Sequence, residues 1–295
     1  MVPTDPIDFD LQFLAVSPAY AIGSGPLYNS LLINYLDEDV ECDVCSEWHL
    51  ENGGKTMVFT LRQGIKFHTG QELTSADVKY SLRMIMGDVD GIVSPRSGII
   101  KEYIDSIETP SRYVVRINMV RPSAYVPKVL ANANSVLYRE GTTRDDLRKA
   151  PAGTGPFVVK QVVPGASRRL ERNPNYFKPG QPYLDAVAIT LIVDTTTQVA
   201  SFVSGRDDIW QGPSSPPEQY MPLFYKIRDE GKVNWLDFLG GSSLDGTLMY
   251  QGKPPFNNLK LRQALNLAID REKMGLATWG DSLKPPQLMV YSQEA

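Results

Sequence analysis

The stretch "FTLRQGIKFHTGQELTSADVKYSL", residues 59–82, decides how this chain is expected to fold. It begins inside segment 56–62, where apolar side chains alternate with the period of two that is typical of a strand. Glycine-marked turns follow this strand. Thr74 is suited to cap a helix after the turns, because Asp77 stands three residues later and completes an acidic variant of the capping box. The stretch therefore predicts a strand, a turn and a capped helix.

Apolar spacing on the C-terminal side of this stretch extends the same pattern. Val78, Leu82 and Ile85 recur at helical spacing, so the predicted helix has one buried stripe. Segment 112–119, "RYVVRINM", alternates strictly and predicts another strand with one apolar face.

The middle third of the chain predicts a sheet with a helix packed on it. Segment 155–173 is typical of a hairpin that turns at a Pro-Gly pair. Segment 187–193, "VAITLIV", is almost continuously apolar, which favours a strand buried on both faces. A helix capped by Thr195 or Thr196 follows, and 206–210 is expected to form a short strand. This strand–helix–strand order favours an α/β layer over a sandwich.

Two more helices are predicted towards the C-terminus. Segment 215–231 has prolines in its first turn and a glycine at its end, and segment 256–274 has an asparagine near its start as a cap. A strand at 232–239 is expected between them. The residues that follow show no domain-closing pattern, so we expect an incomplete chain.

Composition and charge exclude some classes of partner. The 30 Lys and Arg residues against 34 Asp and Glu residues give a net charge of −4, without a basic block. Nucleic-acid binding depends on a concentrated basic face, so we expect no nucleic-acid partner. The longest apolar runs are shorter than the roughly 20 residues that a membrane helix needs, and the first residues, "MVPTDPIDFD", lack the pattern of a secretory signal.

Both cysteines and both histidines lie within residues 41–70, which raises the question of a metal site. Cys42 and Cys45 have the spacing of a zinc half-site, but His49 and His68 are separated by a predicted strand and do not form a second close pair. We therefore expect no bound metal and no cofactor. Two incidental cysteines, or a disulfide if the protein is exported, remain the alternatives.

Catalytic motifs are not found in the sequence. The "GTGPF" segment at 153–157 is not followed by the Lys-Ser/Thr pair of a phosphate-binding loop, so a tight turn into a strand is favoured. Asp207 and Asp208 are adjacent, and in a strand they would face opposite sides. There is no G-x-S-x-G nucleophile motif. We therefore expect a protein that is not an enzyme.

Several motifs together resemble one family. The opening stretch is similar to the F-x-L-R-x-G-hydrophobic-x-F-H-D-G segment and following helix of the peptide/nickel-type ABC-transporter solute-binding proteins (solute-binding protein family 5), with Thr69 in place of the usual Asp. Segments 150–177, 203–209 and 253–274 resemble, in order, its G-T-G-P hairpin, its S-G-x-x-D element and its P-F…R-Q-A…A-I-D-R helix. Matches in this order cover nearly the whole chain.

The resemblance implies a mixed α/β fold, namely a class II periplasmic-binding-protein-like lobe with an inserted α+β subdomain. It implies a lobe core at 1–47 and 152–256, the inserted subdomain at 48–151, and the start of a truncated second lobe at 257–295. It further implies a monomeric solute-capture subunit outside the cytoplasm, periplasmic or membrane-anchored. This subunit would deliver a peptide or similar organic solute to an ABC permease.

Two segments should then reach the solute, since ligand-facing residues lie on loops at strand ends. The candidate ligand-binding residues on these segments are Tyr20, Ser24, Ser242, Ser243, Asp245 and Tyr250. Many relatives have Asn near the position of Tyr250. The alternatives to a transport subunit are a chaperone-like peptide-binding module and, least favoured, a hydrolase.

Overall fold

The computed structural model describes residues 9–12, 25–34, 39–89, 91, 93–94, 97–210, 218–234, 252–270 and 273. The chain divides into two compact units, residues 1–215 and 216–295. The lobe and subdomain boundaries expected from the sequence stay a prediction.

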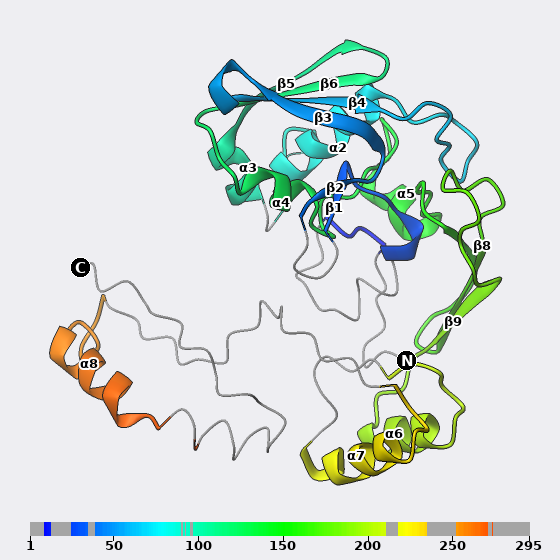
Figure 1. Cartoon of the computed structure of the whole chain (residues 1–295), viewed down its shortest axis with the longest axis vertical. Helices are drawn as coiled ribbons and strands as arrows, with labels where there is room; N and C mark the ends of the chain where they lie inside the picture. The colour runs from blue at the N-terminus through cyan, green and yellow to red at the C-terminus, as the bar shows by residue number, and fades with distance from the viewer. Residues whose placement is uncertain are drawn as a thin grey trace. The chain divides into compact units, whose positions relative to one another are not determined.

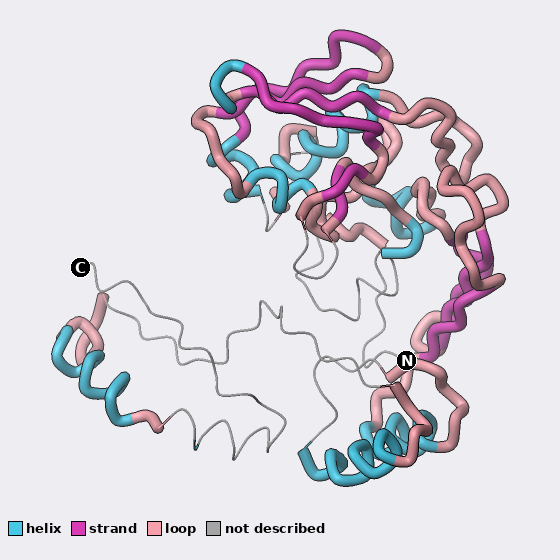
Figure 2. Tube along the Cα trace, viewed as in Figure 1, coloured by secondary structure: helices cyan, strands magenta, loops and turns pink. Residues whose placement is uncertain are grey.

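The first unit is a mixed α/β structure (Figures 1 and 2). Its strands are β1 (Leu32–Ile33), β2 (Glu41–Cys42), β3 (Cys45–Glu51), β4 (Thr56–Leu61), β5 (Ile104–Ser111), β6 (Val114–Met119), β7 (Phe157–Val163), β8 (Ser167–Arg172) and β9 (Ala186–Thr190). Its helices are α2 (Ser75–Met86), α3 (Ser97–Tyr103), α4 (Val126–Leu130), α5 (Arg144–Lys149) and α6 (Thr195–Val203), with 3-10 turns η1 (Gly25–Leu27) and η2 (Asn52–Gly54).

A four-stranded antiparallel sheet in the order β3-β4-β6-β5 contains both strands predicted on either side of the capped helix. Phe59 lies at its centre, opposite Trp48 on β3 and Val115 on β6. The strict alternation predicted at 112–119 is confirmed, because every second residue of β6 is buried. One face of this sheet therefore forms an apolar core.

Helix α2 packs on that face together with α3 (Figure 1). It begins after Thr74, as predicted, and Asp77 Oδ2 accepts hydrogen bonds from the Thr74 backbone N at 2.7 Å and from its hydroxyl at 2.9 Å. Val78, Leu82 and Ile85 are all buried. The capped helix and its single buried stripe are confirmed.

The opposite face of the four-stranded sheet is polar. Arg116 pairs with Glu51 at 2.7 Å, and His49 contacts the same carboxylate at 3.2 Å. Thr56 on β4 donates to Oδ1 of Asn118 on the neighbouring strand β6 at 3.0 Å. These side chains give the sheet a hydrophilic outer surface.

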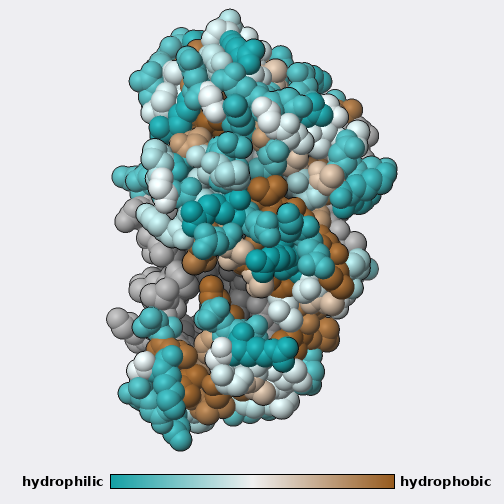
Figure 3. Space-filling model, turned by 90° about the vertical axis from the view of Figure 1, so that its right-hand side faces the viewer, coloured by the Kyte–Doolittle hydropathy of each residue, from teal (hydrophilic) through white to brown (hydrophobic). Residues whose placement is uncertain are grey.

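A three-stranded antiparallel sheet, β7-β8-β9, follows in the chain. The predicted hairpin is confirmed: β7 and β8 pair, and Gly165 supplies the positive φ of 69° that the turn between them requires. The prediction that 187–193 is buried on both faces is wrong. Within β9 only Ile189 is buried, and Val193 beyond it is 74% exposed. Hydrophobic side chains accordingly reach the surface on the side that carries β8 and β9 (Figure 3).

Helix α6 is present where the sequence placed a helix, but its cap differs. Asp194, not Thr195 or Thr196, is the N-cap, and its carboxylate accepts from the Thr197 backbone N at 2.7 Å. The short strand expected at 206–210 is also wrong, because those residues form bends and irregular chain.

The second unit contains a 3-10 turn, η3 (Glu218–Tyr220), and helices α7 (Met221–Asp229) and α8 (Leu259–Ala268). Pro222 lies in the first turn of α7, where the missing N–H does no harm. Asn258 caps α8 and accepts from the Lys260 backbone N at 2.9 Å. Both predicted helices are confirmed. Most of the predicted strand at 232–239 lies outside the described residues.

Candidate functional site

The six candidate ligand-binding residues all lie outside the described residues: Tyr20, Ser24, Ser242, Ser243, Asp245 and Tyr250. They stay a prediction. The residues on both sides of segment 13–24 are described, however, and they define how the chain enters and leaves this part of the predicted site.

The chain before segment 13–24 is held by a buried polar group that we call the Asp10 cluster: Asp10, Gln12, Tyr138 and Arg144. The Asp10 carboxylate is 2% exposed and pairs with the Arg144 guanidinium, which is 10% exposed. Tyr138 donates its hydroxyl to Asp10 Oδ1 at 2.9 Å. Since a buried charge is tolerated only when it is paired and hydrogen-bonded, these contacts make Asp10 a fixed point of the fold.

Gln12 also connects this part of the chain to Ser81 in helix α2 and to Val136. Its side-chain amide donates to the carbonyl oxygens of Ser81 at 3.2 Å and Val136 at 3.0 Å. The backbone carbonyl oxygen of Gln12 accepts from the Ser94 hydroxyl at 2.6 Å. The backbone at residues 9–12 is therefore fixed from several directions.

The protonation state of Tyr138 follows from its surroundings. Complete burial raises the pKa of its phenol well above 10.0, and the nearby Asp10 carboxylate raises this pKa further. The phenol therefore stays protonated at neutral pH, and it can donate to Asp10 throughout the physiological range.

The chain after segment 13–24 is held by glycines of the G-T-G-P motif. The Gly155 backbone N donates to the Leu27 carbonyl oxygen at 3.0 Å. A Cβ atom on Gly153 would lie 1.9 Å from that oxygen, and one on Gly155 would lie 2.4 Å from the Leu27 carbonyl carbon. Only glycine fits this approach of two backbones. The motif is thus explained by close packing, as the sequence analysis favoured over a phosphate-binding loop.

A direct hydrogen bond connects the two sides of segment 13–24. The Tyr28 hydroxyl donates to the Phe9 carbonyl oxygen at 3.0 Å, and the Tyr28 ring packs edge-on against Tyr138, with ring centroids 5.3 Å apart. Residues 9 and 28, which flank segment 13–24 in the sequence, are therefore held in a defined relation to each other.

Several family-like motifs meet in a second polar group, which we call the Gly155 junction: Asn29, His68, Thr154, Gly155 and Asn173. The Gly155 carbonyl oxygen accepts from Asn173 Nδ2 at 2.9 Å and lies 3.1 Å from His68 Nε2. Thr154 donates its hydroxyl to Asn29 Oδ1 at 3.1 Å. Burial lowers the pKa of His68. A neutral imidazole that donates from Nε2 fits this position.

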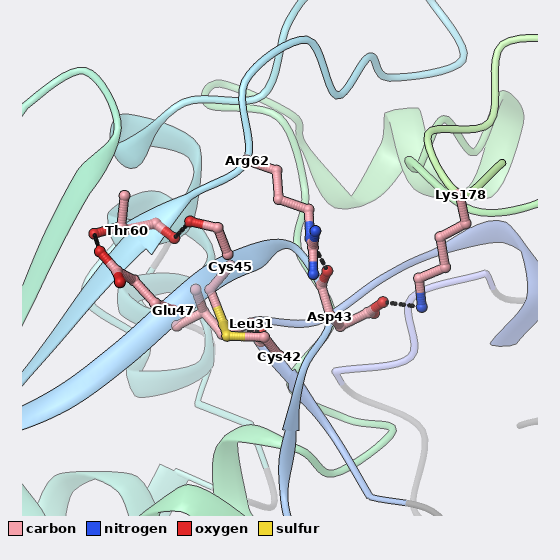
Figure 4. Close-up of a disulfide and its surroundings, with 9 residues drawn as sticks. Leu31, Cys42, Asp43, Cys45, Glu47, Thr60, Arg62 and Lys178 are labelled. Carbon is pink, nitrogen blue, oxygen red and sulfur yellow. Dashed lines mark hydrogen bonds and ion pairs between the residues drawn. A yellow bond between two sulfur atoms is a disulfide. The ribbon is translucent and has the colours of Figure 1, made fainter.

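The two cysteines form a disulfide, Cys42–Cys45 (Figure 4). Asp43 between them accepts a hydrogen bond from Asn29 of the Gly155 junction. The disulfide settles the alternatives that the sequence left open for the pair, because joined sulfurs cannot both act as thiolate ligands for zinc. His49 lies on the exposed face of β3, whereas His68 lies in the junction. Within the described part of the chain, no group of three or more His, Cys, Asp and Glu residues is placed to hold a metal ion.

Asp207 and Asp208 follow α6 in irregular chain, and Asp207 accepts a hydrogen bond from the Ser201 hydroxyl. This carboxylate is therefore hydrogen-bonded to the last turn of α6.

Sequence reasoning missed the Asp10 cluster. Asp10 and Tyr138 are separated by 128 residues, so neither spacing nor periodicity connects them. The one available signal was the combination of an acidic residue in an apolar segment near residue 10 and a Thr-Arg-Asp-Asp helix start at 143–146.

The sequence matches a family described as "Bacterial extracellular solute-binding proteins, family 5 Middle" over residues 39–293. This span is most of the chain, and the order of motifs and the mixed α/β fold agree with it. The chain belongs to this family of solute-binding proteins.

Individual relatives give the same result. The chain is 26% identical to heme-binding protein A of Haemophilus influenzae over 98% of its own length and 57% of that protein. It is 30% identical to the oligopeptide-binding protein AppA of Bacillus subtilis over 76% of its length and 40% of that protein. The chain thus spans about half the length of these relatives.

Solved structures confirm the predicted fold class. The periplasmic binding protein DppA from Helicobacter pylori, in complex with peptide STSA, superposes with a TM-score of 0.75 at 21% identity, covering 94% of this chain and 57% of that one. The binding protein AgaA in complex with agropinic acid, from A. tumefaciens R10, gives 0.68 at 26% identity, covering 76% of this chain and 45% of that one. None of the described helices is both long and apolar enough to cross a bilayer.

Proposed function

We propose that this chain is the solute-capturing part of an extracytoplasmic subunit of an ABC importer, and that it binds solute without changing it chemically. The family match over residues 39–293 carries this proposal. The Cys42–Cys45 disulfide supports a location outside the cytoplasm, because disulfides persist in oxidising compartments. The partner of such a subunit is a membrane permease, and the subunit is periplasmic or membrane-anchored.

The solute class we propose is a peptide or a comparable small organic molecule. AppA and DppA are named or solved as peptide-binding proteins, whereas heme-binding protein A and AgaA are named or solved with other organic ligands. The ligands named for these proteins share only that they are organic molecules. Backbone groups and a few polar side chains are suited to hold such a ligand.

In this proposal, solute contacts come from two segments of the chain. Tyr20 and Ser24 lie between residues 9 and 28, which are joined by the Tyr28–Phe9 hydrogen bond. Ser242, Ser243, Asp245 and Tyr250 lie on the segment before α8. The Asp10 cluster and the Gly155 junction support the first segment, because a binding loop is selective only when its ends are fixed.

A titration of this chain with di- to pentapeptides, followed by calorimetry, tests the proposal. Since the chain spans about half the length of its relatives, we expect affinities weaker than about 1 μM. Tyr20→Ala and Asp245→Asn should each weaken binding at least threefold. Tyr183→Ala is the matched control, because Tyr183 is a well-exposed aromatic residue outside the proposed site.

Two outcomes would overturn the proposal. The first is no heat of binding at millimolar peptide. The second is equal affinity for the two site variants and the Tyr183→Ala control.

The exposed apolar side chains favour a second candidate, a chaperone-like peptide-binding module. Val193 and Leu267 are each more than two-thirds exposed, and exposed apolar surface commonly marks a contact site. A module of this kind would suppress aggregation of an unfolded test protein at equimolar ratio, and Val193→Ser would reduce that effect. Peptide binding that depends on Tyr20 but not on Val193 would decide for the transport subunit.

A further inference from the structure

The disulfide encloses a buried carboxylate. Cys42 ends β2, Cys45 begins β3, and Asp43 and Val44 lie between them. The Cα atoms of the two cysteines are 5.1 Å apart. Cys45 and Asp43 are buried, whereas Cys42 is half-buried. The disulfide thus closes a four-residue loop whose second member points its side chain into the protein (Figure 4).

The Asp43 carboxylate connects three stretches of chain. Its Oδ2 atom accepts from Asn29 Nδ2 at 2.9 Å and from the Ser30 backbone N at 3.1 Å. Its Oδ1 atom pairs with Lys178 Nζ at 2.7 Å (Figure 4). Asn29 also belongs to the Gly155 junction, so Asp43 links the disulfide loop to the turn at 173–178.

The backbone of the same loop is bonded to the residue before β1 and to the residue after β4. The Asp43 backbone N donates to the Leu31 carbonyl oxygen at 3.0 Å, and the Arg62 backbone N donates to the Val44 carbonyl oxygen at 2.9 Å. Any change in the conformation of residues 42–45 therefore moves both the Asp43 carboxylate and these backbone contacts.

We propose that the Cys42–Cys45 disulfide makes the position of Asp43 depend on redox state. In the oxidised chain the closed loop restricts residues 42–45 to the conformation in which Asp43 meets its three partners. In the reduced chain this restriction is lost, and the contacts from Asp43 to Asn29, Ser30 and Lys178 weaken together. The inference concerns the stability of this corner and does not depend on which solute is bound.

The chemistry of the switch is a thiol–disulfide exchange with a dithiol reductant. A thiolate of the dithiol attacks the Cys42 sulfur, the more accessible of the two, and the S–S bond breaks with Cys45 leaving as a thiolate that takes a proton from water. The second thiol of the dithiol then displaces Cys42. The dithiol loses two electrons and becomes a disulfide, and the protein gains two thiols.

The reduced corner keeps a partner for the buried sulfur. Cys45 Sγ lies 3.2 Å from the Leu31 carbonyl oxygen. A Cys45 thiol can therefore donate a weak hydrogen bond to that oxygen. Because this contact compensates part of the loss, reduction should loosen the corner without unfolding the chain.

Denaturant unfolding of oxidised and dithiothreitol-reduced chain tests the inference, with free thiols counted by a thiol-reactive chromophore. Loop closure alone predicts a roughly 25-fold fall in the folding equilibrium constant on reduction. Contacts of Asp43 are lost on reduction as well. The factor by which reduction lowers the folding equilibrium constant should therefore be at least three times larger in the wild type than in Lys178→Met. Arg121→Met is the matched control, because it removes only an exposed ion pair with Glu102. Reduction should lower the folding equilibrium constant of this variant by the same factor as that of the wild type.

Equal falls in the wild type and in Lys178→Met would overturn the inference, and so would no fall at all. The Cys42→Ser/Cys45→Ser variant, which keeps a donor beside the Leu31 carbonyl oxygen, should behave as the reduced wild type and should not respond to dithiothreitol.

Hydrogen exchange on the wild-type chain gives an independent measurement that requires no variant to fold. The amides of Ser30, Asp43 and Val44 should exchange at least tenfold faster after reduction, whereas the amide of Val78 in α2 should not change. Uniform acceleration, or acceleration at none of these sites, would contradict a local effect on Asp43. Because no solute is used, failure here is distinct from failure of the proposed transport function.

Discussion

The two cores of the first unit are built in different ways. The core under the four-stranded sheet consists mainly of apolar side chains from β3, β4, β6 and α2, which all lie within residues 45–119. The core beside the three-stranded sheet contains Phe9, Tyr28, Tyr138 and Phe157, with the Asp10 cluster buried next to them. Its members come from segments more than 100 residues apart. The first core rests on periodic apolar pattern, and the second on specific polar contacts.

The largest expected effect tests the first core. Phe59→Ala removes a fully buried ring at the centre of the four-stranded sheet, and it should lower the free energy of unfolding by about 3–5 kcal/mol. Val162→Ala, in the half-exposed end of β7, should cost less than about 1 kcal/mol. Urea denaturation measures both, and similar losses would show that the two sheets are equally packed.

Arg144→Met tests the second core at its buried ion pair. It removes the guanidinium from a carboxylate that is 2% exposed, and a cost of about 3 kcal/mol is expected because a buried charge loses its cation. Arg121→Met removes an exposed pair with Glu102 and should cost between about 0 and 1 kcal/mol. If the two variants lost the same free energy of unfolding, the buried ion pair would not stabilise the second core.

Gly155→Ala tests the contact between backbones at the second core. The added Cβ would lie 2.4 Å from the Pro26 carbonyl oxygen and 2.5 Å from the Tyr28 backbone N. We expect a loss of about 1–3 kcal/mol from overpacking, measured as a lower urea midpoint. Gly25→Ala, with nothing within 4 Å of the added atom, serves as the control. A harmless Gly155→Ala would mean that residues 26–28 can shift freely.

The pH dependence of stability tests the Gly155 junction. Burial lowers the pKa of His68 below 6.5, so the folded chain binds fewer protons there than the unfolded chain does. Its contribution to stability is therefore present above about pH 6.5 and is lost as pH falls from there towards the folded pKa. His68→Gln should reduce this part of the acid-induced loss in thermal melts. His49→Gln, which removes an exposed imidazole, should retain it.

The smallest effect has the opposite sign. Gly98→Ala in α3 meets nothing within 4 Å, and Gly98 lies on the exposed side of the helix. We expect a gain of roughly 0.5–1 kcal/mol, because alanine loses less conformational freedom on folding than glycine does. Differential scanning calorimetry should show a higher melting temperature, and a lower one would mean that α3 is not helical at this residue.

Sequence predicted the first core well for a physical reason. The alternation in β4 and β6 and the Thr74–Asp77 cap of α2 are local features, and local features are what periodicity and capping rules detect. Each of these elements is present in the structure at the predicted place.

The errors have physical reasons too. Four successive residues, Asp194 to Thr197, are all capable of capping α6, and the choice of Asp194 depends on backbone geometry. Segment 187–193 is apolar enough for a buried strand, but no described helix covers its outer face, so exposure follows from tertiary context. The Asp10 cluster was invisible because its partners are so distant in sequence.

The contacts of the residues on either side of segment 13–24 also limit the order in which the chain can fold. Gln12 bonds to residue 136, and Asn29 bonds to Thr154, 125 residues later. At a synthesis rate of 5–20 residues per second, these partners emerge roughly 6–25 s after the N-terminal residues do. During that interval the first thirty residues have none of these bonds. These contacts of Gln12 and Asn29 therefore cannot form in a nascent chain until residues 136 and 154 have been synthesised.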